Sequence, residues 1–245
     1  MRLNKFIADS GLCSRREADG LITARQVRVN GIVAGLGTEV ADGDEVTVKG
    51  RRIGTRRKQV YIALHKPVGV TCTTDRREPT NIIDFVGHPA RIFPIGRLDK
   101  DSEGLILLTT DGNIVNTLLR AENHHEKEYR VTVDRPITPE FISGMSAGVP
   151  MLGTRTLPCP VFRVDDYTFR IILTQGLNRQ IRRMCEYFGY DVRRLQRVRI
   201  VNIPLGRLKR GHWRDLTAQE VADLLQQRPS GVGSRGVARK PRPAR

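Results

Sequence analysis

The sequence has few cysteines and histidines, and none of them is spaced for a metal site. Its 245 residues contain four cysteines and five histidines, and no two cysteines form a C-x-x-C pair. These spacings exclude the usual zinc-binding motifs. We therefore expect free thiols in a reducing compartment and no bound metal.

Long apolar runs are absent as well. No stretch approaches the length of a membrane-spanning helix. The first five residues, "MRLNK", do not contain the apolar core of a signal peptide. We expect a cytoplasmic protein with no membrane partner.

Negative charge is scarce relative to positive charge. The chain has 26 Asp and Glu against 42 Lys and Arg, a formal net charge of +16. A protein this basic usually binds a polyanion, because each phosphate contact releases condensed counterions. Nucleic acid is the first expectation and an anionic membrane surface is the second. Hydrophobic residues make up 39% of the chain, which is enough for a folded core.

The first fifty residues have the pattern of a small helical and β unit. Leu3 and Ile7 recur at helical spacing, and Ser14 opens the sequence "SRRE", which is typical of a capping box at the start of a second helix. Short strand patterns follow over residues 27–29 and 46–48. The expected order is two helices followed by a small sheet.

The remainder has more strand patterns than helix patterns. Strands are expected near 60–64, 91–95, 105–109, 128–133, 157–164, 168–174 and 194–201. Helices are expected near 81–86, 112–121, 138–147, 178–188 and 217–227. The strands do not alternate strictly with the helices. The pattern therefore predicts an α+β fold on a mostly antiparallel mixed sheet.

Composition divides the chain into four parts. Residues 1–50 and 60–228 are the two folded units, and the Gly- and Arg-rich segment 51–59 is the expected linker between them. Residues 229–245, "PSGVGSRGVARKPRPAR", contain almost nothing apolar. We expect this last segment to be a disordered basic tail.

The sequence "GRLDKDSEG", residues 96–104, concentrates five charges between two apolar runs. Carboxylates at Asp99, Asp101 and Glu103 alternate with other residues, so an extended loop would present them on one side. Such carboxylates perform acid–base chemistry in glycosidases or bind Mg²⁺. The alternative is a polar hairpin loop in which Asp and Ser form the turn.

The N-terminal unit resembles an S4 domain, a small RNA-binding module. The resemblance rests on "RLNKFIADSGLCSRREADGLI", followed by "VRVNG" and "GDEVTV". It implies a basic face for RNA phosphates made by Arg15, Arg16, Arg25 and Arg28, with the two former residues at a helix start. The alternative is an ordinary solvated helix surface.

The larger unit resembles the pseudouridine synthases. "GRLDKDSEG" with "LLTTDG" is similar to their central motif, "EKEYRV" to the second motif and "TQGLNRQIRRM" to the third. The resemblance implies that Asp99 is the catalytic residue, that Tyr129 stacks on the target base, and that Arg182 pairs with the catalytic carboxylate. It also implies that Arg97 occupies the space left by the flipped base.

The order of these motifs behind an S4-like module is similar to the RsuA-type ribosomal branch. The context "NHHEKEYRVTVDRPIT" is most similar to a subgroup acting on 23S ribosomal RNA. The resemblance implies an RNA partner, either 23S ribosomal RNA or a ribosome-assembly intermediate, with transfer RNA as a further option. Nothing in the sequence demands a second subunit, so we expect a monomer.

Isomerisation of uridine to pseudouridine neither adds nor removes atoms, so the resemblance implies no cofactor. The carboxylate either attacks C1′ of the ribose or removes the 2′ proton, and the sequence does not choose between these routes. The target base must leave its stack to be reached. A stacking contact with the tyrosine ring is worth about 1–3 kcal/mol.

Other interpretations of the same residues remain open. Tyr129 is alternatively an ordinary strand aromatic, and Arg182 a solvated helix arginine. Arg179 competes with it as the partner of the catalytic carboxylate, although we expect Arg179 and Lys100 to contact phosphate. Further arginines in the run 192–201 are expected to extend the RNA surface, on a strand with a bulge: Arg193, Arg194, Arg197 and Arg199.

At the level of the whole protein, the alternative function is a non-catalytic RNA-binding or ribosome-assembly factor. A glycoside hydrolase built on the carboxylate cluster is a third possibility. That class needs two carboxylates at a defined separation, and the net charge of +16 argues against it.

Overall fold

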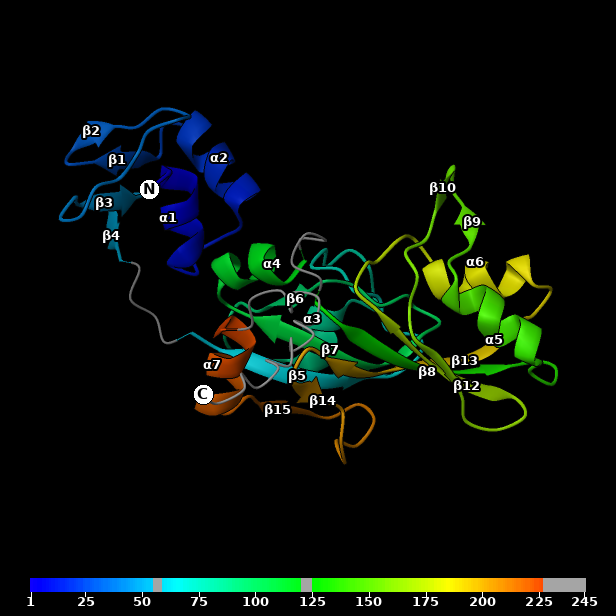
Figure 1. Ribbon diagram of the computed structural model, residues 1–245. Coiled ribbons are helices and arrows are strands. Elements are labelled where there is room, and N and C mark those ends of the chain that lie inside the picture. The colour runs from blue at the N-terminus through cyan, green and yellow to red at the C-terminus, as the bar shows by residue number, and fades with distance from the viewer. Residues whose placement is uncertain (55–58, 120–124, 227–245) are drawn as a thin grey trace, which may run out of the picture.

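The computed structural model describes residues 1–54, 59–119 and 125–226, which fold as a small N-terminal unit and a larger sheet-based unit (Figure 1). The expected tail and residues 55–58 of the expected linker lie outside the described residues. No helix within the described ranges is long and apolar enough to cross a membrane.

The small unit packs two helices against a short antiparallel sheet. Its elements are α1 (Leu3–Asp9), α2 (Arg15–Thr23), β1 (Val27–Val29), β2 (Ile32–Val33), β3 (Val46–Val48) and β4 (Arg51–Ile53), with sheet order β2-β1-β3-β4. The predicted capping box is confirmed, because Ser14 Oγ accepts from the Glu17 amide at 3.1 Å and Glu17 Oε2 accepts from the Ser14 amide at 2.6 Å. Leu3 and Ile7 are buried in its core.

Strand β4 corrects the expected start of the linker. Residues 51–53 were expected to connect the units, but they pair with β3 in the register Val46↔Ile53, Thr47↔Arg52 and Val48↔Arg51. Their two arginines are exposed while Ile53 packs on the core. A charged edge strand of this kind resembles a linker in composition, which is why sequence alone misplaces it.

The larger unit is a nine-stranded mixed sheet. Its main path is β11 (Val161–Arg163), β12 (Thr168–Leu173), β8 (Lys127–Val133), β13 (Val192–Ile200), β7 (Glu103–Thr109), β5 (Tyr61–Lys66) and β15 (Trp213–Asp215). Strand β14 (Ile203–Pro204) pairs with β13, and β6 (Phe93–Ile95) pairs with β7. Only β13 and β7 run parallel among these described pairs. The predicted α+β class on a mostly antiparallel mixed sheet is confirmed.

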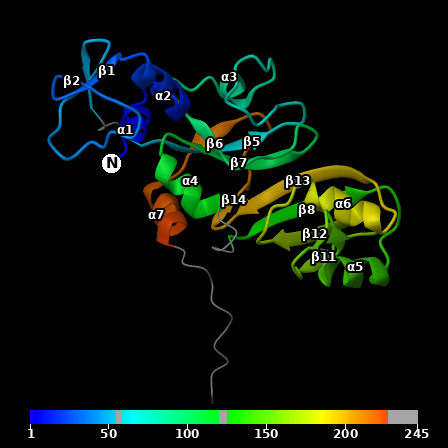
Figure 2. The ribbon, with the colours of Figure 1, turned by 90° about the horizontal axis from the view of Figure 1, so that it is seen from above.

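Helices cover the sheet in two groups. Figures 1 and 2 show α5 (Pro139–Ser146) and α6 (Gln180–Tyr187) over the half formed by β11, β12, β8 and β13, while α4 (Gly112–Leu119) and α7 (Ala218–Gln226) lie beside the other half. Helix α3 (Ile82–Val86) packs near β5, and β9 (Pro150–Met151) and β10 (Thr154–Arg155) form a separate hairpin. Every helix predicted from periodicity in this unit is present.

The parallel pairing of β13 with β7 joins the two halves of the sheet. It is short, with the registered pairs Gln196↔Glu103 and Arg197↔Gly104. Gly104 has φ +111°, and a Cβ placed on it would lie 2.3 Å from the Arg197 carbonyl oxygen, so only glycine fits this approach. Register shifts at Val192/Arg194 and Arg197/Arg199 confirm the irregularity predicted for β13.

Candidate active site

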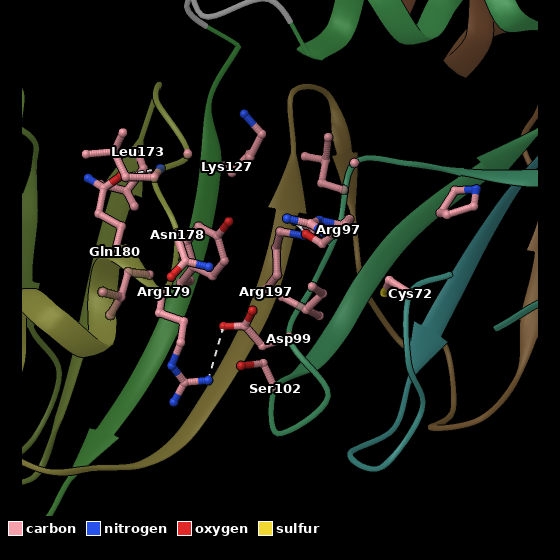
Figure 3. Close-up of a pocket in the computed structure, with 18 of the residues that line it drawn as sticks. Cys72, Arg97, Asp99, Ser102, Lys127, Leu173, Asn178, Arg179, Gln180 and Arg197 are labelled. Carbon is pink, nitrogen blue, oxygen red and sulfur yellow. Dashed lines mark hydrogen bonds and ion pairs between the residues drawn. The ribbon is translucent and has the colours of Figure 1, made fainter. Parts of the chain in front are cut away.

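A pocket opens where the two halves of the sheet meet. Its volume is about 990 Å³. The walls come from the β6–β7 connection, strands β8 and β13, and the segment that leads into α6 (Figure 3). All three residues that the sequence analysis assigned to catalysis line the pocket: Asp99, Tyr129 and Arg182.

Residues 96–102, here called the carboxylate loop, follow β6 and lead directly into β7. Leu98 is buried in the core on one side of Asp99, and the Ser102 amide donates to the Asp99 carbonyl at 3.1 Å. A second loop supports it, because the Gly69 amide donates to the Lys100 carbonyl at 2.8 Å. These bonds fix the loop backbone while the Asp99 side chain stays 39% exposed to the pocket. The arrangement presents the Asp99 carboxylate to a ligand that enters the pocket.

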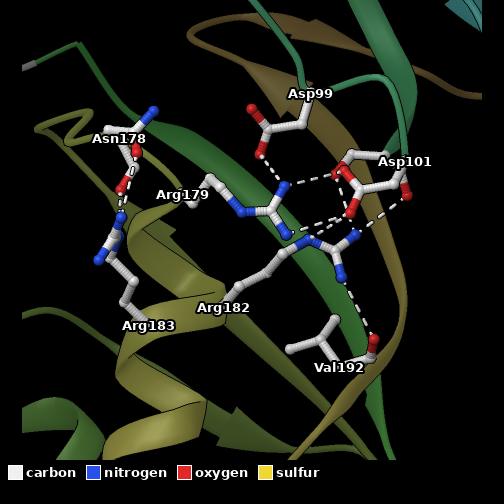
Figure 4. A network of polar contacts seen from close by, with 8 residues as sticks. Asp99, Asp101, Asn178, Arg179, Arg182, Arg183 and Val192 are labelled. Atoms are coloured by element: carbon white, nitrogen blue, oxygen red, sulfur yellow. Dashed lines mark hydrogen bonds and ion pairs between the residues drawn. The ribbon is translucent and has the colours of Figure 1, made fainter.

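Arg179, and not Arg182, lies next to Asp99. Arg179 Nη1 is 3.8 Å from Asp99 Oδ2, and the same guanidinium donates to both oxygens of Asp101 at 3.3 Å (Figure 4). The expected Arg182–Asp99 pair is therefore wrong in this structure. Arg179 precedes the first turn of α6 in the left-handed conformation, with φ +50°, and its side chain reaches back over the carboxylate loop.

Arg182 instead holds the backbone of the carboxylate loop. Its Nη2 donates to the Asp101 carbonyl at 3.0 Å and to Ser102 Oγ at 3.3 Å, and its Nη1 donates to the Val192 carbonyl at 3.2 Å. Its Nε lies 3.4 Å from Asp101 Oδ2. The side chain is only 16% exposed, so it is not the solvated helix arginine of the alternative interpretation.

Asp101 orders the loop between the two arginines. Partial burial acts to raise the pKa of Asp101, but the hydrogen bond from Arg179 and the charges of both arginines outweigh it and hold that pKa below its usual value. Glu103 turns away from the pocket, is 3% exposed, and pairs with Arg194 at 2.5 Å. Asp99 is thus the carboxylate that this loop directs into the pocket.

Tyr129 stands on β8 with its ring in the pocket wall. It is half-buried and packs against the core under α5 and α6. Arg197 lies directly opposite on β13, so both side chains project from the same face of the sheet. A planar group that enters beside Asp99 meets this ring.

The expected phosphate contacts lie around the pocket and on the small unit. Arg97 and Lys100 are exposed on the carboxylate loop, and Lys100 Nζ lies 3.6 Å from Glu78. The four arginines expected on the small unit are all exposed: Arg15, Arg16, Arg25 and Arg28. The first two begin α2 and the others follow its end, about 12 Å along the helix. They form two basic groups and not one.

Two buried cations lie beside the pocket: Lys66 had no role assigned from the sequence, and the role expected for Arg197 was wrong. Lys66 is fully buried, and its Nζ donates to the carbonyls of Pro67 and Val70 at 2.9 Å; burial lowers its pKa. Arg197 was expected on the RNA surface, but it is 3% exposed and donates to the Leu105 carbonyl at 2.7 Å. An arginine-rich strand gives no local sign of which member turns inward. Arg199 likewise binds Glu126 and Glu128.

The cysteines and histidines of the described residues form no metal-binding cluster. Within the described ranges no three His, Cys, Asp or Glu side chains are grouped to hold a metal ion. Cys72 and His125 line the pocket, and burial raises the pKa of the Cys72 thiol. The charged groups and the phenol that line the pocket are one carboxylate, several cations and one tyrosine, beside neutral polar side chains.

Comparisons with known proteins identify the family of each unit. Residues 60–187 match the family described as RNA pseudouridylate synthase, and residues 1–46 match the S4 domain. The dual-specificity RNA pseudouridine synthase RluF of Salmonella typhi is 59% identical over 227 residues, which are 92% of this chain and 78% of that protein. Ribosomal large subunit pseudouridine synthase B of Bacillus subtilis is 35% identical over 91% of this chain and 95% of its own.

A solved structure gives the same result for the fold. The crystal structure of a pseudouridylate synthase is similar with a TM-score of 0.68 at 30% identity, and the match covers 91% of this chain and 99% of the other. The resemblances predicted for both units are confirmed. The chain belongs to the RNA pseudouridine synthase family and carries an S4 domain ahead of the catalytic unit.

Proposed function

We propose that this enzyme isomerises a uridine of 23S ribosomal RNA and that Asp99 is its catalytic residue. The observation that carries the proposal is the pocket itself, in which one exposed carboxylate faces an aromatic wall and is bordered by Arg179 at 3.8 Å. A carboxylate in this setting is held in one orientation and stays accessible. It can attack C1′ of a flipped nucleotide or remove its 2′ proton.

The base of that nucleotide stacks on Tyr129. The ring forms part of the pocket wall, and stacking of a base on an aromatic side chain is worth about 1–3 kcal/mol. Arg97 is exposed at the start of the carboxylate loop, where it can enter the space that the flipped base leaves. Arg182 acts as a positioning residue, because it binds the loop backbone on the far side of Asp101.

Charge and the relatives together support a ribosomal substrate. The net charge of +16 favours a polyanion, and the S4 domain adds exposed Arg15 and Arg16 at a helix start. The name of one relative specifies the large ribosomal subunit, and that of RluF specifies dual specificity. We infer 23S ribosomal RNA or an assembly intermediate as the substrate and transfer RNA as a second one, acted on by a monomer in the cytoplasm.

Each of the two folded units has its own role in this proposal. Residues 1–54 tether the RNA, residues 60–226 perform the reaction, and the basic segment 229–245 adds electrostatic attraction to RNA. Phosphates near the pocket are contacted by Arg179 and Lys100, and those farther away by Arg25 and Arg28.

The two other candidate functions have less support. A glycoside hydrolase needs a second working carboxylate, whereas Asp101 is held by two arginines and Glu103 is buried and paired with the exposed Arg194. A binding factor without chemistry would not need an exposed carboxylate aimed into a pocket.

Mapping of pseudouridine by carbodiimide adducts tests the proposal. Ribosomal RNA is compared from cells without the gene and from cells rescued by wild type or Asp99→Asn. One stop in 23S RNA should return only with wild type, while the purified variant binds RNA as wild type does. Turnover by Asp99→Asn would refute the assigned role, and an unchanged map in ribosomal and transfer RNA would favour the binding factor.

A further inference from the structure

Two cations that no carboxylate neutralises share the tyrosine wall of the pocket, among the residues that the structure describes. Lys127 precedes Tyr129 by two residues on β8, and Arg197 lies directly opposite Tyr129 on β13. Because side chains two apart on a strand point to one face, Lys127, Tyr129 and Arg197 all project to the same side. All three line the pocket that contains Asp99. Figure 3 shows Lys127 and Arg197 on two of its strands.

Arg197 is almost fully enclosed and incompletely bonded. It is 3% exposed, its Nε donates to the Leu105 carbonyl at 2.7 Å, and its Nη1 donates to the Arg97 carbonyl at 3.3 Å. Its Nη2 is buried without a hydrogen-bond partner in the described ranges. In the part of the chain that the structure describes, no carboxylate forms an ion pair with it. A buried charge without a paired carboxylate lowers the stability of the fold, so its presence calls for a functional explanation.

Lys127 is in a similar state. It is half-buried, and its Nζ donates to the His125 carbonyl at 3.2 Å. None of the ion pairs formed among residues 1–54, 59–119 and 125–226 includes it. Its strand neighbour Glu128 points to the opposite face, where Arg199 binds it at 3.1 Å. The pocket therefore holds a surplus of positive charge at the place where the base stacks.

The proposed reaction produces negative charge at that place. When the C1′–N1 bond breaks, its electron pair leaves with uracil, whichever route Asp99 follows. The charge spreads from N1 to the carbonyl oxygens O2 and O4. Donors fixed where charge develops, in a site closed to water, are the strongest single source of rate enhancement in many enzymes.

Resting on the proposed function, we infer that Lys127 is a further catalytic residue, which donates a hydrogen bond to a carbonyl oxygen of the departing uracil while Arg197 supplies supporting positive charge. The bond that breaks is C1′–N1. After the base turns, the C5–C1′ bond forms while Asp99 either leaves C1′ or returns the 2′ proton. C5 then loses its proton to solvent or a pocket base, and N1 gains one from solvent. Lys127 stays protonated throughout, so atoms and charge balance.

The position of Lys127 favours a contact with the flipped base over a contact with RNA phosphates. Arg97 and Arg179 line the pocket and are exposed, and both suit phosphates. Lys127 is instead next to the tyrosine on the inner wall. A phosphate contact would contribute to affinity, whereas a contact to developing charge contributes to the rate of the chemical step. The two roles are therefore separable by experiment.

Three variants provide the first test. Lys127→Met removes the charge at nearly constant length, Lys127→Arg keeps it, and Arg130→Gln removes a charge from the exposed face of the same strand. Single-turnover conversion of a uridine-containing stem–loop and RNA affinity are measured for each, with thermal unfolding as a check of folding. Lys127→Met should be about 10²-fold slower with unchanged affinity. Lys127→Arg should be within about tenfold of wild type, and Arg130→Gln should equal it.

A substrate with a better leaving group provides the decisive comparison. Fluorine at C5 withdraws electrons and stabilises the uracil anion, so cleavage of 5-fluorouridine should depend less on Lys127. We expect the loss in Lys127→Met, measured as disappearance of the 5-fluorouridine nucleoside by mass spectrometry, to be about tenfold smaller than the loss with uridine. Equal losses on the two substrates, or weaker RNA binding at an unchanged rate, would overturn the inference.

The pH profile adds a readout that a purely structural role would not change. Burial and then the charge of Arg197 lower the pKa of Lys127 to about 8. The titratable and charged groups that share its pocket are Cys72, Arg97, Asp99, His125, Tyr129, Arg179, Arg182 and Arg197. Because the protonated amine is the active form, the wild-type rate should fall above a pH of about 8 and that of Lys127→Arg should not. Ionisation of uridine itself affects both alike. Parallel profiles would contradict the role, whereas failure of the proposed function would appear as activity in Asp99→Asn.

Discussion

Replacement of Gly104 by alanine tests the close approach of β7 and β13 beside the carboxylate loop. Gly104 has φ +111°, a region that costs an L-residue about 1–3 kcal/mol. The new Cβ would also lie 2.3 Å from the oxygen and 2.6 Å from the nitrogen of Arg197, both of them backbone atoms that cannot turn aside. Forced separation of packed elements costs about 1–3 kcal/mol more. We expect the free energy of unfolding to fall by about 4 kcal/mol.

Gly153→Ala is the matched control. Gly153 also has positive φ, +72°, in the β9–β10 hairpin of the same unit, but nothing lies within 4 Å of the place that an alanine methyl would take. It should lose only the conformational contribution, about 1 kcal/mol. Urea unfolding followed by circular dichroism measures both variants, and the difference in midpoint isolates the steric contribution. If Gly104→Ala lost no more stability than Gly153→Ala, the argument from close approach would be refuted.

Three further predictions concern the pocket, the C-terminal helix and the RNA surface. Arg179→Met removes the guanidinium beside Asp99, and single-turnover assays should show a rate about 10²-fold lower, on the scale of losing one oriented charged donor. Glu220→Gln removes a carboxylate whose pKa is held at about 2, chiefly by hydrogen bonds from Arg214. The stabilisation is present above the ordinary glutamate pKa and is lost as pH falls through about 2, so melts should show a cost of about 1 kcal/mol near neutral pH that vanishes in strong acid. Arg15→Gln should weaken RNA binding and reduce its salt slope by about 1 in titrations at several salt concentrations, and an unchanged slope would remove this residue from the interface.

Local signals in the sequence were sufficient for most elements. The capping box at Ser14 and Glu17 places α2, because both of its hydrogen bonds form between residues three apart. Apolar periodicity locates α5 and α6, because apolar residues three and four positions apart form one face of a helix. The irregular alternation in 192–200 anticipates the register shifts of β13.

Non-local contacts were beyond those signals. The parallel pair of β13 with β7 joins residues more than ninety positions apart, and nothing in either strand specifies the other. The arginine that meets Asp99 depends on the left-handed backbone of Arg179, which turns that side chain across the loop. The inward orientation of Arg197 depends on the pairing of β13 with β7, because its side chain binds the Leu105 carbonyl on β7. Sequence therefore identifies the type of residue at the site more readily than its partner.

The parallel pairing of β13 with β7 also determines when the pocket can form during synthesis of the chain. Asp99 is made early, but the strand that supports its loop, β13, ends at Ile200. Contacts at such separation form late, because a long loop must close before they are gained. The carboxylate loop thus acquires its support from Arg197 only after most of the chain has been made. A chain that stops before this strand retains the motif containing Asp99 but not the scaffold that orients it, so catalytic competence reports completion of the fold.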